Sequence, residues 1–543
     1  MGDTGDLRSC GGEVNDYMKL QSDTDKNQPS EKLTMDELVN KTVGLSNFRH
    51  FGFLSIFMLG HITASMMCYL PVFCGYIPYT EWQCLSDSCF LLLNNHTGES
   101  DTFYTRKTMC SNKFKADVDF TWTPKRSSFA VDFGIYCGTE TQKSSINSFY
   151  FIGAFVGLCG SSSLYEIFGR KKVTLAAGVT AIGATLGIAF ASDIQTILGL
   201  RVVQGLGVLV AMTGRYIWCM EFTPLRLRNI SNALLSGTWP LGTCTLILIC
   251  YFVFNWRYAV GIVSVIGVLC YTPLIFCPES PRFLAQHGRE KEALEILNKM
   301  ARFYKNPPLP AESLDLEQRS KKQSALKQLK DFILFPAVLR RTLFMMSCWF
   351  AVSLFYYGLS FGWHKMGNNI FASQGFACLA EVVAVILSLA IISQAGRKKT
   401  LIMVFLGIGI FFGISIVDAR ISSNWTVQQV GCLIVIVFIG AGFITVYLYT
   451  AELSPTSHRG LILSLCSGIA RIGSFIGPYV THLFEIKNTL AIVMGTFSGV
   501  GLLSAIGTMF LLEDTTGVDI PETPSDIQGT KRLGEEEEDL QDS

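Results

Sequence analysis

The stretch Phe168-Gly-Arg-Lys-Lys172 recurs later in the chain as Ala395-Gly-Arg-Lys-Lys399. A second stretch, EFTPLRLR from Glu221 to Arg228, recurs as ELSPTSHR from Glu452 to Arg459, with Glu, Pro and Arg in the same register. Both pairs lie at matching positions in two similar series of apolar segments. Such an internal duplication is typical of secondary transporters built from structural repeats. The repeat therefore predicts a chain of two equivalent halves.

The composition indicates a membrane protein. Of the 543 residues, 49% are hydrophobic and 16% are charged, whereas a soluble chain has about 25% charged residues. Six apolar runs long enough to cross a bilayer precede the polar stretch 278–339, and six more follow it. The net charge of +1, without basic runs, argues against nucleic-acid binding. We therefore expect an all-α polytopic membrane protein with twelve transmembrane helices in two six-helix halves.

These runs also predict the domain organisation. We expect a cytoplasmic N-terminal segment (1–50), an N-terminal half (51–277) with an extracellular loop domain (74–144) between its first two helices, a cytoplasmic helical linker (278–339), a C-terminal half (340–511) and a disordered acidic cytoplasmic tail (512–543). Short loops rich in Lys and Arg favour the cytoplasmic side. The loops after the second, fourth, eighth and tenth runs are basic, so both termini are predicted to be cytoplasmic.

Five cysteines are grouped around the polar segment between the first two runs. They are Cys74, Cys84, Cys89, Cys110 and Cys137. In an oxidising compartment this grouping favours disulfide bonds, although an odd number leaves one cysteine over and the pairing stays open. The sequon at Asn95 is a glycosylation site if this loop is extracellular. The cysteine spacing fits no tetrahedral metal site, and we expect neither a metal nor a cofactor.

Several motifs form a recognisable set. They are Phe168–Lys172, Arg201-x-x-x-Gly205, Glu221 with its Pro and Arg, Pro278-Glu-Ser-Pro-Arg-Phe283, Tyr356-Tyr-Gly-Leu359 and Tyr449-Thr-Ala-Glu-Leu-Ser-Pro455. Together they resemble the major facilitator superfamily, and within it the organic cation, anion and zwitterion transporters of solute carrier family 22. The resemblance extends over roughly 45–515, with the carnitine and zwitterion branch nearest. It implies transport of small organic ions by alternating access, and no enzymatic activity.

Charged side chains within apolar runs cost roughly 3 kcal/mol each, which makes them candidate binding residues. Glu381 lies in the middle of the eighth run and Arg471 in the middle of the eleventh. By resemblance, Glu381 matches an acidic position that binds ammonium groups, and Arg471 matches an arginine of anion and carnitine transporters. We expect them to bind the ammonium and the carboxylate of one zwitterion. Alternatively, they pair with each other and only stabilise the fold.

Other residues are weaker candidates for the substrate site. Arg215, expected in the outer part of the fourth run, would favour anions if it faces the cavity. Tyr356, Tyr357 and Trp239 could contact a quaternary ammonium through cation–π interactions. Arg201 is expected to be structural.

By the same resemblance, five charged residues at the cytoplasmic ends of the spans form ion pairs across the inner gate when the cavity opens outward, and these pairs break when it opens inward. They are Glu221, Glu452, Arg170, Arg397 and Arg282. The chain departs from the family pattern at Glu166 and Ile167, where an Asp-Arg pair is usual, and at Ser393, where Asp is usual. These replacements call the gating balance, and transport itself, into question.

The leading interpretation is a plasma-membrane secondary transporter of zwitterions of the carnitine or betaine type, working as a monomeric unit in the lipid bilayer. An organic anion exchanger is the alternative, favoured by Arg215 and Arg471. A non-transporting, receptor-like relative is a second alternative, favoured by the altered gate residues. The coupling ion, sodium or proton, stays open, as do exchange and simple facilitation.

Overall fold

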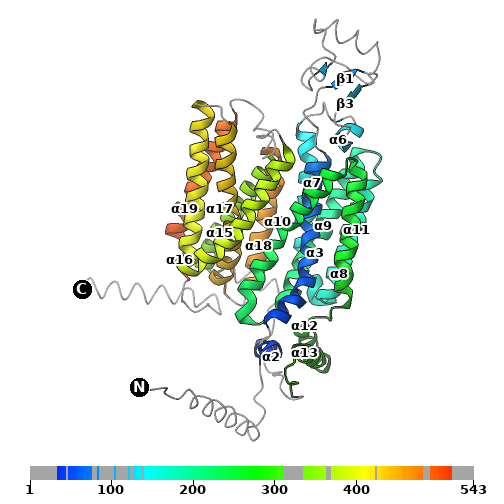
Figure 1. Cartoon of the computed structure of the whole chain (residues 1–543). Coiled ribbons are helices and arrows are strands. Elements are labelled where there is room, and N and C mark those ends of the chain that lie inside the picture. Colours follow the sequence, from blue (N-terminus) through cyan, green and yellow to red (C-terminus); the bar gives the residue numbers. More distant parts are fainter. Residues whose placement is uncertain are drawn as a thin grey trace, which may run out of the picture.

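The computed structural model describes both series of apolar segments. It describes residues 34–44, 47–75, 82–84, 103–104, 120–122, 127–133, 135, 140–310, 334–362, 369–421, 425–455, 458–480 and 489–515. Nearly all of these residues are helical, and 12 helical segments are long and apolar enough to cross a membrane. The predicted twelve-helix fold class is therefore confirmed, and Figure 1 shows the helices as one bundle.

The first six spans form the N-terminal half. They are α3 (Asn47–Cys74), α7 (Glu140–Phe168), α8 (Arg170–Ala189), α9 (Ile194–Glu221), α10 (Arg228–Phe252) and α11 (Trp256–Phe276). Each is predominantly apolar, because a span in lipid must satisfy its backbone internally and present apolar side chains outward. Many large hydrophobic side chains, such as Phe252 and Phe276, are accordingly exposed on the surface of the bundle.

The C-terminal half repeats this arrangement. It consists of α15 (Pro336–Gly362), α16 (Ile370–Ile421), α17 (Trp425–Leu453), α18 (Arg459–Val480) and α19 (Thr489–Leu511). Helix α16 supplies two spans, Ile370–Ile392 and Gln394–Ile416. The break between them is at Gly396, whose φ of 78° lies in the left-handed region that glycine adopts without strain. Gly169, with a φ of 93°, makes the equivalent break between α7 and α8.

The two ends of the bundle differ (Figure 1). One, here called the loop end, carries a three-stranded antiparallel sheet in the order β2-β1-β3 and the short helix α6. These elements are β1 (Trp82–Cys84), β2 (Phe103–Tyr104), β3 (Phe120–Trp122) and α6 (Phe129–Asp132). The sheet departs from the purely helical prediction; its aromatic residues favour strands, and it lies between spans.

The other end, here called the linker end, carries short helices that flank the spans (Figure 1). They are α2 (Met35–Val43), the 3₁₀ turn η2 (Leu225–Leu227), α12 (Pro281–Gln286) and α13 (Glu290–Tyr304). The Thr34 backbone amide and hydroxyl donate to the Glu37 carboxylate at the start of α2, and these hydrogen bonds lower the pKa of Glu37. Helices α12 and α13 fall within the segment 278–339 that is predicted to be a helical linker.

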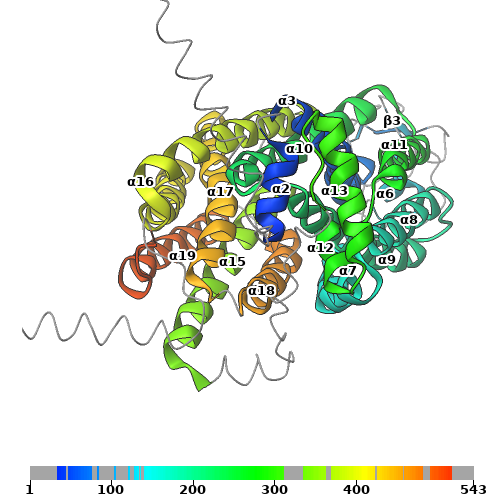
Figure 2. The ribbon, with the colours of Figure 1, turned by 90° about the horizontal axis from the view of Figure 1, so that it is seen from below.

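The two halves lie side by side when viewed from the linker end (Figure 2). They meet along two seams, α7 with α18 and α10 with α16. In the first seam, Ser144 Oγ donates to the Pro478 carbonyl at 2.9 Å and Ser148 Oγ donates to the Phe475 carbonyl at 2.8 Å. In the second, the rings of Tyr251 and Phe371 lie 5.6 Å apart. All of these contacts are near the loop end, so the halves are closed against each other there.

Within the N-terminal half, α7 and α9 pack backbone to backbone. A Cβ atom placed on Gly205 would overlap the carbonyl of Tyr150, and one on Gly153 would overlap the carbonyl of Val202. Small residues at such contacts are typical of helix association in membranes. Arg201 fixes the same contact, because its guanidinium donates to backbone carbonyls of both α3 and α7. Arg201 is thus structural, as predicted.

We therefore expect Gly205→Leu to abolish folding, because side-chain overlap with backbone costs at least about 1–3 kcal/mol and cannot be relieved by a rotamer change. The measurement is the amount of protein at the cell surface and its melting temperature in detergent. Gly199→Leu is the matched control: it is on the same helix, and a Cβ atom there meets nothing within 4 Å. Equal expression of both variants would contradict this account of the packing.

Candidate functional site

Glu381 lies on the side of α16 that faces the interior of the bundle. Ala377 and Ala384, one turn before and after it, are 6% and 0% exposed, whereas Leu379 and Val383 on the opposite face are 61% and 46% exposed. Glu381 itself is only partly covered. A carboxylate on the buried face of a span that is still partly exposed points away from lipid and into the space between helices.

A chain of hydrogen bonds joins Glu381 to the other half of the molecule. The Tyr356 hydroxyl, on α15, donates to Glu381 Oε1 at 2.8 Å. Trp239 Nε1, on α10, donates in turn to the Tyr356 hydroxyl at 2.8 Å. Of the three predicted aromatic residues, Tyr356 therefore contacts the glutamate directly, and Trp239 is connected to it through Tyr356. The hydrogen bond from Trp239 to Tyr356 crosses between the halves.

Arg471 lies on the buried face of α18 and is 7% exposed. Its guanidinium lies near Tyr357, Tyr150 and Tyr447. Its Nε atom is buried without a hydrogen-bond partner. The guanidinium thus has an N–H group without an acceptor, and a carboxylate ligand could accept a hydrogen bond from it.

The two charges are held apart by adjacent tyrosines. Tyr356 contacts Glu381 and Tyr357 contacts Arg471, and the two tyrosine rings meet edge to face with centroids 4.9 Å apart. In the part of the chain that the structure describes, Glu381 and Arg471 form no ion pair with each other. The structure therefore contradicts the alternative in which Glu381 and Arg471 pair with each other and only stabilise the fold. Both charges belong to the C-terminal half.

Arg215 occupies a different place from the one expected. It lies six residues before Glu221, the last residue of α9, and so is near the linker end rather than in the outer part of its span. It is 0% exposed, donates to the Tyr271 hydroxyl at 2.5 Å and packs against the backbone of α3 at Gly60. Its Nε and Nη2 atoms have no hydrogen-bond partner. Arg215 is thus buried within the N-terminal half, away from the Glu381–Arg471 pair.

The charged residues at the linker end pair within each half in this conformation. Arg170 donates to Glu221 Oε1 through both Nε and Nη2, at 3.1 and 2.8 Å. Arg397 and Glu452 form the equivalent pair in the C-terminal half at 2.8 Å. Both arginines directly follow the glycine at the break between two spans, so the duplicated sequence builds a duplicated ion pair. Pairing across the inner gate is expected only when the cavity opens outward, so this conformation does not test that prediction.

Arg282 also pairs within the N-terminal half. It shares the Asp36 carboxylate with Arg228, each at 2.6 Å. Asp36 belongs to α2, Arg228 begins α10 and Arg282 lies in α12. The carboxylate therefore ties the segment before the first span to the linker and to the fifth span.

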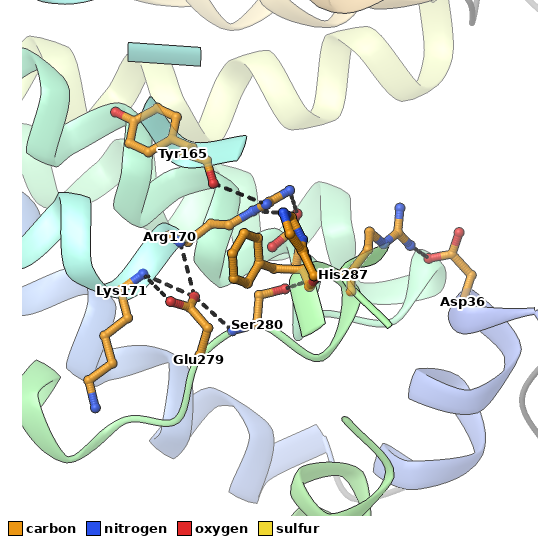
Figure 3. A network of polar contacts seen from close by, with 10 residues as sticks. Asp36, Tyr165, Arg170, Lys171, Glu279, Ser280 and His287 are labelled. Atoms are coloured by element: carbon orange, nitrogen blue, oxygen red, sulfur yellow. Dashed lines mark hydrogen bonds and ion pairs between the residues drawn. The ribbon is translucent and has the colours of Figure 1, made fainter. Parts of the chain in front are cut away.

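Glu279 is a structural residue of this end that sequence reasoning missed. Its carboxylate accepts hydrogen bonds from the backbone amides of Arg170, Lys171 and Ser280 at 3.0 Å each, and so caps the first turn of α8 (Figure 3). A carboxylate at a helix N-terminus satisfies free amides and the helix dipole together. The sequence signal for this cap is the glutamate within the motif Pro278-Glu-Ser-Pro-Arg-Phe283, which the sequence analysis uses only to mark the family.

Several predicted sites lie outside the described residues. They are the glycosylation site Asn95 and the cysteines Cys89, Cys110 and Cys137; of Cys84 only the backbone, in β1, is described, and the side chain of Ser393 is not. Cys74 is described as the buried last residue of α3, and its thiol is free. Its assignment to the disulfide group of the polar segment is therefore wrong in this structure, because Cys74 belongs to a span.

Comparison with known proteins places this geometry in a family. The Sugar (and other) transporter family matches residues 93–526. Solute carrier family 22 member 7 of Bos taurus is 29% identical over 413 residues, covering 74% of this chain and 73% of the relative. The human organic cation/carnitine transporter 2 is 27% identical over 404 residues, covering 73% and 71%.

Solved structures agree on the fold. The proton:xylose symporter XylE bound to 6-bromo-6-deoxy-D-glucose superposes with a TM-score of 0.59 at 15% identity, covering 86% of this chain and 97% of the symporter. An inward open conformation of XylE from E. coli gives 0.59 at 14% identity, covering 89% and 99%. The chain therefore belongs to the Sugar (and other) transporter family of the major facilitator superfamily, and members of solute carrier family 22 are among its relatives.

Proposed function

We propose that the chain transports small zwitterions that carry an ammonium and a carboxylate, of the carnitine or betaine type, across the plasma membrane by alternating access. The observation that carries this proposal is the unpaired arrangement of Glu381 and Arg471, each held by one of two adjacent tyrosines. A zwitterion would neutralise both charges at once, whereas a singly charged solute would leave one of them unmatched.

The ammonium end of the ligand would lie against Glu381. Tyr356 contacts this carboxylate and Trp239 contacts Tyr356, and their rings offer apolar and cation–π contact to a quaternary ammonium. The carboxylate end would accept hydrogen bonds from Arg471, in the forked geometry that guanidinium and carboxylate groups share. Because Trp239 comes from the N-terminal half, a ligand that displaces its hydrogen bond to Tyr356 would also act on the contact between the halves.

The orientation proposed here has the linker end in the cytoplasm and the loop end outside. The basic clusters that follow α7, the first span of α16 and α17 lie at the same end as α2, α12 and α13, and such clusters favour the cytoplasmic side. Closure of both seams at the loop end, together with ion pairing within each half at the linker end, supports an inward-facing state. Outward opening would then separate the halves at the loop end and rearrange contacts at the linker end.

An organic anion exchanger is the second candidate. Arg471 favours it, because its buried Nε lacks a hydrogen-bond partner and a guanidinium binds carboxylates. The deciding experiment is uptake of labelled carnitine, an organic dianion and tetraethylammonium into cells expressing the chain, with and without a sodium gradient. Saturable carnitine uptake above the other two supports the proposal, and dianion uptake alone supports the exchanger. Absence of all three, with the protein confirmed at the surface, would favour a non-transporting relative.

Removing the charge of Glu381 or of Arg471 should impair the transport of different classes of ligand. We expect Glu381→Gln to raise KM for carnitine and tetraethylammonium by about tenfold or more, because a hydrogen-bonded charge contributes about 1.5–3 kcal/mol. Arg471→Ala should impair carnitine and the dianion by a similar factor and spare tetraethylammonium. Glu295→Gln on the exposed face of α13 is the matched control, with no expected effect. Unchanged carnitine kinetics in both Glu381→Gln and Arg471→Ala would contradict the proposal that these two charges bind the ligand.

The duplicated ion pair at the linker end should behave as a buried unit. We expect Arg170→Ala to reduce stability by about 3–5 kcal/mol, because it leaves the carboxylate of Glu221 buried without its cation. The double variant Arg170→Ala/Glu221→Gln should recover part of that loss. Melting temperature and surface expression of the two single variants and the double variant measure the coupling. Strictly additive losses would show that the pair does not act as a unit.

A further inference from the structure

The seam between α10 and α16 has a regular antiparallel register. A Cβ atom placed on Gly237 would lie 3.9 Å from Cγ1 of Val385, and the rings of Tyr251 and Phe371 lie 5.6 Å apart. From Gly237 to Tyr251 is 14 residues, and from Phe371 to Val385 is also 14. Both helices therefore advance about four turns between these two contacts, and their facing positions recur about every seven residues.

A cysteine from each half occupies the position midway between these contacts. Cys244 lies seven residues from both Gly237 and Tyr251, and Cys378 lies seven residues from both Phe371 and Val385. The register thus sets Cys244 opposite Cys378, so that the two thiols are neighbours across the seam. Both thiols are free in the structure, with Cys378 buried and Cys244 partly exposed.

We propose that Cys244 and Cys378 form an oxidation site, at which a peroxide converts the two thiols into a disulfide that joins the two halves of the molecule. The Cys244 thiol, the more exposed of the two, would attack a peroxide oxygen and become a sulfenic acid, with release of water when the peroxide is hydrogen peroxide. The Cys378 thiol would then attack that sulfur and release a second water as the S–S bond forms. The two thiols together lose two electrons, and the peroxide gains them.

The position of this bond determines its effect. Cys244 lies eight residues before Phe252, the end of α10, and Cys378 lies eight residues after Ile370, the start of α16, so both are near the closed loop end. A disulfide holds its two Cα atoms within about 7 Å. If the chain works by the proposed alternating access, the bond would prevent the loop end from opening and would stop transport. Only this effect on transport rests on the proposed function; the formation of the disulfide does not.

A second cysteine pair serves as an internal comparison. Cys74 of α3 is in side-chain contact with Cys250 of α10, and both helices belong to the N-terminal half. A disulfide there would join two helices of one half and would not restrain the motion between halves. The two pairs therefore separate oxidation as such from cross-linking between halves.

The test treats the full chain, reconstituted in liposomes, with hydrogen peroxide, then blocks remaining thiols and maps disulfides by mass spectrometry of an unreduced digest. We expect a cross-linked peptide containing Cys244 and Cys378 that disappears on treatment with dithiothreitol. It should be absent from Cys244→Ser and from Cys378→Ser and unchanged in Cys159→Ser, which removes an exposed thiol of α7. Oxidation of Cys159, or a Cys74–Cys250 cross-link, without any Cys244–Cys378 peptide would overturn the proposed site.

Uptake of labelled carnitine into the same liposomes tests the effect on transport. Peroxide should abolish uptake by the wild-type chain reversibly and leave Cys244→Ser active, whereas Cys250→Ser should remain as sensitive as the wild type. A Cys244–Cys378 cross-link with undiminished uptake would overturn the arrest of transport. A cross-link in a chain that never takes up carnitine would instead count against the proposed substrate, while leaving the oxidation site established.

Discussion

An ionised side chain in the apolar medium of a membrane is destabilising unless nearby dipoles or an opposite charge replace its lost water, and the placement of charge in this molecule follows from that constraint. Arg201 meets it with backbone carbonyls from two neighbouring helices. Arg170 meets it with the carboxylate of Glu221 and the carbonyl of Tyr165. These residues brace the N-terminal half, and their compensation is nearly complete.

Three other charges are compensated only in part. Glu381 receives one hydroxyl hydrogen bond, Arg471 contacts tyrosines, and Arg215 has one tyrosine hydroxyl while two of its nitrogens lack partners. A ligand of complementary charge can supply the compensation that the protein does not. For Glu381 and Arg471 the adjacent tyrosines also keep the two charges apart, which preserves both for a ligand.

The duplicated sequence motifs form the same ion pair in each half at the linker end. Each half has a glycine break, an arginine directly after it and a glutamate at the end of a later span, and these form the same ion pair twice. The loop end has no such charges in its described contacts between halves; there the seams are closed by serine-to-carbonyl hydrogen bonds, aromatic rings and the two thiols. Contacts of this kind are individually weak and separable, which suits a surface that must open and close.

The sequence by itself determined the number of spans, the two-half organisation and the identity of the charged residues, because apolar run length, motif recurrence and charge inside a span are all local properties of the chain. It also identified Glu381, Arg471, Tyr356 and Trp239, although it did not predict that hydrogen bonds would connect three of them. It misplaced Arg215 within its span, assigned Cys74 to the wrong segment and missed the capping role of Glu279. Each of these depends on which helices pack together and at what register, and that is decided by contacts between residues far apart in sequence, such as Gly205 against Tyr150 or α10 against α16. The opposition of Cys244 and Cys378 has the same origin, since only the packed seam brings two ordinary apolar-span cysteines face to face.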